Sequence, residues 1–198
     1  WRHRLGDGQQ ALQATYNELT AAAATIVMFE TAVVPGVLQT ADYATAVLRD
    51  VTANHGQDVA DIDQAVAVRL QRGQLLYDPS KTFDLIITET VLLGSPAPPP
   101  AMIAQLDRLL NALDLPNVTL RVLPMRAGVP FVPLNSFEIY DDELVIVESI
   151  AGEEHHRGDD ADAATYRRAL ERLRAAAVAG DEARALIQAA IERHRRDN

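Results

Sequence analysis

The spacing of apolar residues changes twice along this chain, and these changes limit the fold more than any other feature of the sequence. From Gln9 to Val27, apolar side chains recur at steps of three and four, the spacing of one stripe on a helix. Around Phe83 the segment TFDLIIT switches to alternation, which is typical of a strand. Beyond residue 160 the helical spacing returns. We therefore expect an α+β fold, with helices at both ends.

The N-terminal part, residues 9–77, predicts three helices before any strand. The first covers Gln9 to Val27, and the third follows Asp61 and carries Arg69. Between them, Pro35-Gly36 predicts a turn in which Gly36 holds a positive φ.

The second helix follows this turn at once. Leu38 is expected to be buried in the core. The Thr40 hydroxyl is expected to cap the N-terminus of the helix, as threonine commonly does at such positions. Tyr43 is expected on the inner face of the helix.

The central part, residues 82–150, predicts a small mixed sheet. A strand at residues 83–88, a helix and a second strand in LPNVTLRVLP form a β-α-β unit. The apolar stripe expected to face inward on that helix is Ile103, Leu106, Leu110 and Leu113. The segments SFEIY and ELVIVES, separated by Asp141-Asp142, predict a β-hairpin. Residues 161–196 predict a helical pair broken at Gly180-Asp181, so one regulatory domain is expected to span residues 1–198.

The charge is acidic and unevenly placed. Eighteen Lys and Arg against 28 Asp and Glu give a net charge of −10. Residues 159–198 hold eight acids and eight arginines, so residues 1–158 carry the whole excess. Such a surface disfavours the phosphates of nucleic acid. There is no cysteine and no apolar run of membrane-spanning length, so we expect a cytoplasmic protein without a thiolate site.

Acidic residues on the predicted strands leave an enzymatic alternative open. Asp84, Glu89, Glu138 and Glu148 resemble the carboxylates of a metal-dependent nuclease, active or degenerate, but Lys81 is the only lysine that could assist them. The more common explanation is that such acids face solvent and discourage edge pairing of strands.

The segment GEEHHRGDD also contains possible metal ligands. Adjacent histidines such as His155 and His156 point to opposite sides of an extended segment, so we interpret residues 152–160 as a solvated loop. The sequence has no nucleophile elbow and no glycine-rich phosphate loop. We therefore expect a non-enzymatic domain with no catalytic residues, no cofactor and no metal.

Several segments together resemble a known family. They run in order from Phe29 to Ile191 and include VVPGVLQTADYATAVLRD, VAVRLQRGQLL, LPNVTLRVLP and YRRALERLRAAAV. The set resembles the C-terminal domain, of unknown function, of actinobacterial Xre-type helix-turn-helix regulators, which are antitoxin-like and include WhiJ-like regulators. This resemblance implies a role in transcription regulation, with a DNA-binding helix-turn-helix upstream of Trp1. A chain that opens on Trp1 and not on methionine agrees with that expectation.

The resemblance also directs attention to the turn near residue 36. Its motif positions include Pro35, Gly36 and Leu38, which we interpret as structural. The candidate ligand or partner surface is Gln39, Thr40, Tyr43 and Arg69.

The resemblance implies partners as well. It suggests a small protein encoded nearby, and we also expect a homodimer formed through residues 163–196 or the N-terminal helices. A small-molecule effector stays open. DNA would be bound only through the upstream domain.

Overall fold

The computed structural model describes residues 2–3, 9–54, 61–126, 135–149 and 152–196. These residues contain one mixed eight-stranded sheet in the order β1-β7-β6-β5-β2-β3-β4-β8. The strands are β1 (Arg2–His3), β2 (Thr25–Glu30), β3 (Thr82–Thr88), β4 (Val118–Leu123), β5 (Phe137–Tyr140), β6 (Leu144–Ser149), β7 (Gly152–Arg157) and β8 (Val178–Ala179). The strands β2, β3 and β4 run parallel to their neighbours in this group, and β2 meets β5 antiparallel.

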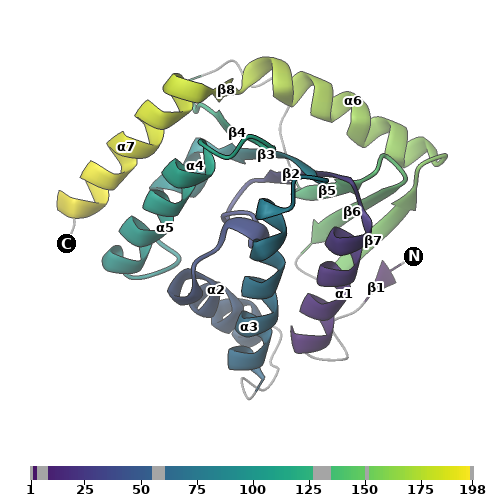
Figure 1. Ribbon diagram of the computed structural model, residues 1–198, viewed down its shortest axis with the longest axis horizontal. Helices are drawn as coiled ribbons and strands as arrows, with labels where there is room; N and C mark the ends of the chain where they lie inside the picture. Colours follow the sequence, from purple (N-terminus) through teal and green to yellow (C-terminus); the bar gives the residue numbers. More distant parts are fainter. Residues whose placement is uncertain (1, 4–8, 55–60, 127–134, 150–151, 197–198) are drawn as a thin grey trace.

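Helices cover both faces of this sheet. They are α1 (Gln9–Ala22), α2 (Ala41–Asn54), α3 (Ile62–Gly73), α4 (Glu89–Leu93), α5 (Pro99–Ala112), α6 (Ala161–Ala176) and α7 (Gly180–Arg196), with short 3-10 turns η1 (Gly36–Leu38) and η2 (Gln74–Tyr77). Figure 1 shows α6 alone on one face and α1, α2, α3, α5 and α7 on the other. No helix of the described residues is long and apolar enough to cross a bilayer. The α+β class expected from the sequence is confirmed.

The central strand β2 corrects the prediction of three helices before any strand. Helix α1 ends at Ala22, and Thr25–Glu30 continues as a strand between β3 and β5. Ile26 and Met28 pack into the core on one face, whereas Val27 and Phe29 pack on the other. A strand buried on both faces shows no alternation of apolar and polar residues, so its sequence continued the helical pattern before it.

The predicted β-α-β unit and hairpin are both confirmed. Strands β3 and β4 are parallel and joined through α5, and β5 pairs antiparallel with β6. Asp141 and Asp142 turn the hairpin with φ of 50° and 60°, the left-handed region that short polar residues tolerate. The Asp141 carboxylate accepts hydrogen bonds from the amides of Ala24 and Thr25, both at 2.8 Å, and so fixes the hairpin against the start of β2.

The inward stripe of α5 differs from the predicted one by about one residue. Met102, Leu106 and Leu109 are fully buried, together with the polar Gln105. The predicted Ile103, Leu110 and Leu113 pack against the core only partly buried. Only Leu106 of the predicted stripe lies at its centre.

Two further predictions about the later part of the chain are wrong. Residues 152–157, expected in a solvated loop, form β7, which pairs with β6 and β1. The C-terminal helices are separated by β8 at Val178–Ala179, and Gly180, with φ of 56°, begins α7. In both cases pairing with a distant strand determines the structure. The predicted helical pair itself is confirmed as α6 and α7.

Candidate functional site

A partly enclosed cavity lies between the helical layer and the strands β5, β6 and β7. It measures about 170 Å³ and is lined by residues of α1, α2 and α3, by the end of β2, and by the turn containing Gly36 and Gln39. A cavity of roughly 150 Å³ can hold a molecule the size of benzene. This cavity is therefore large enough for a small molecule.

Four glutamates on four different strands face this cavity, and we call them the glutamate cluster: Glu30, Glu138, Glu148 and Glu153. The strand register explains why they meet. Glu138 lies opposite Met28, two residues before Glu30 on the same face, and Glu148 lies directly opposite Glu153. Like charges placed opposite each other on neighbouring strands are destabilising, so this arrangement requires compensation.

Two arginines of α3 supply part of that compensation. Arg69 and Arg72 are three residues apart and therefore share one side of the helix. Arg69 donates from Nε to Gln13 Oε1 at 2.9 Å and from Nη1 to Gln39 Oε1 at 2.6 Å. The guanidinium of Arg72 donates to Gln13 Oε1 at 3.3 Å and lies 5.1 Å from the centre of the Tyr16 ring.

Two tyrosines donate hydrogen bonds to the glutamates. The Tyr16 hydroxyl lies 2.6 Å from Glu153 Oε1 and 3.4 Å from Glu148 Oε1. The Tyr140 hydroxyl donates to Glu138. These contacts satisfy some of the carboxylate oxygens without neutralising their charge.

Some buried polar atoms at this cavity have no hydrogen-bond partner. They are Nε and Nη1 of Arg72, Oε2 of Glu30 and Nε2 of Gln9. Arg72 and Glu30 are each only 4% exposed. Leaving such groups unpaired is costly, so a site of this kind favours a molecule that completes their hydrogen bonds.

The buried glutamates hold their protons more tightly than exposed ones would. Burial and the charge of Glu148 raise the pKa of Glu138 to about 7, and the same two causes raise the pKa of Glu30 well above its usual value. Burial and the charge of Glu153 raise the pKa of Glu148. Burial and the nearby Arg72 lower the pKa of Arg69 to about 10. The cluster can therefore take up or release protons near neutral pH.

The structure places two of the four predicted surface residues at the cavity. Gln39 and Arg69 line it and are hydrogen-bonded to each other. Tyr43 is fully buried, and its hydroxyl accepts a hydrogen bond from the Val34 amide at 3.1 Å. Gln39 Nε2 donates to the carbonyl of the same residue, Val34, at 2.7 Å. Tyr43 and Gln39 therefore fix the turn from both sides.

Thr40 does not cap α2 with its side chain, so that prediction is wrong. Its hydroxyl is buried without a partner, whereas its amide donates to Gln105 Oε1 at 2.7 Å. Gln105 also donates to the Leu38 carbonyl at 2.9 Å. Gln105, a distant residue on α5, thus fixes the backbone just before α2.

The three structural positions of the turn keep their structural role. Leu38 is fully buried, and the Leu38 amide donates to the Pro35 carbonyl. Gly36 is not among the described residues with positive φ, which corrects the reason for a glycine there. A Cβ at Gly36 would lie 2.3 Å from Nη2 of Arg72. A larger residue at position 36 would therefore require the end of the Arg72 side chain to move.

The acids considered for a nuclease do not form one site. Glu138 and Glu148 belong to the glutamate cluster, but Asp84 pairs with Arg121 and Arg174 at 3.2 Å and 2.6 Å. Glu89 instead accepts a hydrogen bond from the amide of Met125 at 2.7 Å. In the part of the chain that the structure describes, no group of three or more His, Asp or Glu is arranged to hold a metal ion.

Lys81, His155 and His156 are not among the residues that line the cavity. Lys81 Nζ donates to the carbonyls of Ala21 and Ala23, both at 2.7 Å, and so caps the end of α1. His155 contacts Glu153 at 3.2 Å, whereas His156 contacts Asp162 at 3.7 Å from the opposite face of β7. The two histidines point to opposite sides, as the sequence predicted.

Most of the residues at the cavity could not be identified from the sequence. Tyr16, Glu30, Arg72 and Glu153 were not proposed for it. One signal was present, because Glu138 lies between apolar neighbours in the strand FEIY. A charged residue inside an apolar strand is rarely buried unless it has a function or a partner.

A family model described as "Domain of unknown function (DUF5753)" matches residues 13–189, which include all four glutamates and both arginines. No curated protein matches the chain.

Proposed function

The chain belongs to the DUF5753 family, and from this premise we propose that it is the signal-receiving domain of a helix-turn-helix transcription regulator of the actinobacterial Xre type. The signal is a small polar molecule that binds in the cavity beside the glutamate cluster. The observation that carries this proposal is the set of buried, unpartnered atoms of Arg72 and Glu30 that line the cavity. Binding sites are typically cavities with a few convergent polar groups of this kind.

The proposed role is binding without chemistry. The carboxylates of Glu138 and Glu153 accept hydrogen bonds from Tyr140 and Tyr16, an arrangement that positions a ligand. A ligand that bridges α3 and the strands would stabilise one arrangement of the helical layer. A shift in the populations of the conformations requires only that the molecule bind one conformation more tightly than another.

The proposal is tested by equilibrium dialysis of a cellular metabolite mixture against the purified protein, with mass spectrometry of the retained compounds. We expect at least one compound to be enriched by the wild type and by Arg49→Met, an exposed control on α2. Arg72→Met should lose it while remaining folded by circular dichroism. If the wild type enriches no compound, or if Arg72→Met enriches the same compounds, the proposal fails. A nuclease would instead degrade DNA in a divalent-metal assay.

DNA binding is assigned to an upstream domain. The net charge of −10, all of it within residues 1–158, repels phosphates. We expect no gel shift of duplex DNA by this chain at micromolar concentration and physiological salt. A shift under those conditions would contradict the assignment.

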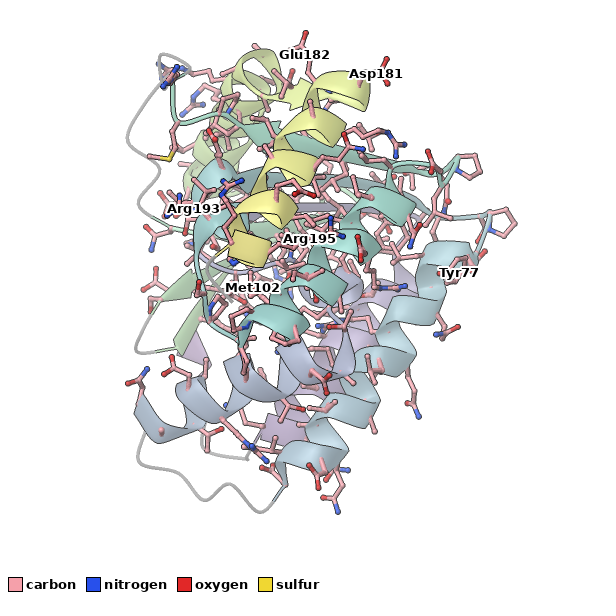
Figure 2. All side chains as sticks on the ribbon, turned by 90° about the vertical axis from the view of Figure 1, so that its left-hand side faces the viewer. Tyr77, Met102, Asp181, Glu182, Arg193 and Arg195 are labelled. Carbon is pink, nitrogen blue, oxygen red and sulfur yellow. The ribbon has the colours of Figure 1, made fainter. Side chains whose placement is uncertain are left out.

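We propose self-association through the outer face of α7. Figure 2 shows Asp181 and Glu182 at the start of this helix and Arg193 and Arg195 near its end. An antiparallel α7 of a second copy would place each acidic end against a basic end, as a two-fold interface allows. A dimer of this kind suits a regulator that reads a two-fold operator.

Light scattering tests this contact. Ala189→Arg changes an exposed position at the middle of α7 and should leave a monomer where the wild type is a dimer. Leu173 is unsuitable for such a test, because it is fully buried in the core under α6. A wild-type monomer would contradict self-association, and a stable complex with a co-expressed neighbouring protein would replace it with a hetero-complex.

A further inference from the structure

The cavity carries more negative than positive charge. Four glutamates against two arginines give a formal charge of −2 when all are ionised. The described hydrogen bonds of Arg69 and Arg72 go to Gln13 and Gln39, and no ion pair joins either arginine to the glutamate cluster within the described residues. The excess charge must be met by protons or by a bound cation.

A second observation, independent of the acids, points to a bound molecule. The guanidinium of Arg72 is buried beside the cluster, and two of its nitrogens have no acceptor. Oε2 of Glu30, which also lines the cavity, has no donor. The cavity therefore lacks acceptors for two guanidinium nitrogens and a donor for one carboxylate oxygen.

We propose, on the basis of the function proposed above, that the cavity binds a small organic compound with an ammonium group at one end and a hydrogen-bond acceptor, such as a carboxylate, at the other. The ammonium group lies among Glu30, Glu148 and Glu153, and the acceptor lies against Arg72. An ammonium group has three donors, which match carboxylates that come from three different strands. Charge-assisted hydrogen bonds of this kind are among the strongest in proteins.

Other ligand classes fit the cavity less well. A divalent metal ion needs converging oxygen ligands, and the described residues contain no such group. A dianion would be repelled by the carboxylates of the glutamate cluster. An uncharged molecule could make no charge-assisted hydrogen bond in which the ligand supplies a charge, either to the carboxylates or to Arg72.

Binding of an ammonium compound should compete with protons. The charged and titratable groups that face the glutamates are Tyr16 of α1, Tyr43 of α2, Arg69 and Arg72 of α3, and Tyr140 and His155 of the sheet. Burial raises the pKa of Glu138 to about 7, so its carboxyl is mostly protonated at pH 6 and mostly ionised at pH 8, and burial raises the pKa of Glu30 and Glu148 as well. An alkylammonium group stays charged to about pH 10. Affinity should therefore rise from pH 6 to pH 8.

The experiment uses matched compounds of two to five carbons: the α,ω-amino acid, the diamine, the diol and the dicarboxylate of each length. Isothermal titration calorimetry in two buffers of different ionisation enthalpy measures affinity and proton release. We expect one amino acid to bind at least tenfold more tightly than the diol and dicarboxylate of its length. The diamine should bind more weakly than this amino acid, because Arg72 repels its second ammonium group.

Variants identify the two ends of the site. Glu148→Gln should lower the affinity for the amino acid at least tenfold and reduce the proton release on binding. Glu18 is exposed on α1, and Glu18→Gln should change neither the affinity nor the proton release. Gly36→Ala keeps every charge but displaces Arg72, so it should weaken binding of the amino acid and strengthen binding of the diamine, which Arg72 repels. Equal binding of the diol or dicarboxylate, or no binding by any amino acid or diamine, would overturn the proposal. If metabolite dialysis then still yields an Arg72-dependent ligand, only the ammonium assignment fails.

Discussion

Replacing Glu138 by glutamine should make the protein more stable at alkaline pH. The side chain is 5% exposed, and burial beside Glu148 raises its pKa from the ordinary 4.5 to about 7. The folded state therefore binds this proton more tightly than the unfolded state does. Its contribution to stability is present below pH 4.5 and is lost as the pH rises toward 7. A gap of this size corresponds to roughly 3 kcal/mol at about 1.36 kcal/mol for each pH unit.

Glutamine resembles the protonated acid and can still accept the hydrogen bond from Tyr140. Glu138→Gln and wild type should therefore have similar free energies of unfolding at pH 5. At pH 8 the variant should be more stable by up to roughly 3 kcal/mol. Urea denaturation at pH 5, 6, 7 and 8 measures this difference. Glu143 lies in the exposed hairpin turn, and Glu143→Gln is the control, which should have the same free energy of unfolding as the wild type at each pH.

The result that refutes this reasoning is a difference between Glu138→Gln and wild type that does not change with pH. That outcome would mean that Glu138 is ionised in both states across this range, and that Arg72 compensates it fully. A variant less stable at every pH would mean that packing, and not charge, determines the effect.

Three further predictions concern single contacts. Tyr43→Phe leaves the buried Val34 amide without its acceptor, so it should lower the free energy of unfolding, measured by urea denaturation, by about 1 to 3 kcal/mol. Tyr77 is 57% exposed, and Tyr77→Phe should leave the free energy of unfolding unchanged. Equal stability of the two variants would contradict the contact. Lys81→Met keeps the apolar stem of the side chain but removes two hydrogen bonds to the end of α1. It should lower the free energy of unfolding by about 1 to 3 kcal/mol and speed amide hydrogen exchange at the end of α1. Unchanged exchange there would exclude this cap. Gly36→Ala should lower the melting temperature by only a few degrees, since Arg72 is flexible; loss of the fold would mean that the turn itself requires glycine.

Much of the fold could be predicted from the sequence because the signals were local. The stripes of α3 and α6 and the hairpin at Asp141-Asp142 arise from spacing and turn chemistry within a few residues. The sequence also drew attention to the turn containing Gly36, to Gln39 and to Arg69, and both polar residues line the cavity.

Strands β2 and β7 are two of the strands that could not be predicted in this way. Strand β2 is buried on both faces and so shows no alternation, and β7 is polar along its length, with burial coming from its neighbours. Whether a segment becomes a strand depends on the strands that pair with it, and those lie far away in the sequence.

The site itself was decided by tertiary structure. Glu30, Glu138, Glu148 and Glu153 meet only because β2, β5, β6 and β7 pair in one register, and a shift of one residue would turn a strand's glutamate to the opposite face. Single-sequence periodicity contains no information on that register. It also cannot show that the guanidinium of Arg72 would be buried without acceptors, because the burial of a polar group depends on every element that packs around it.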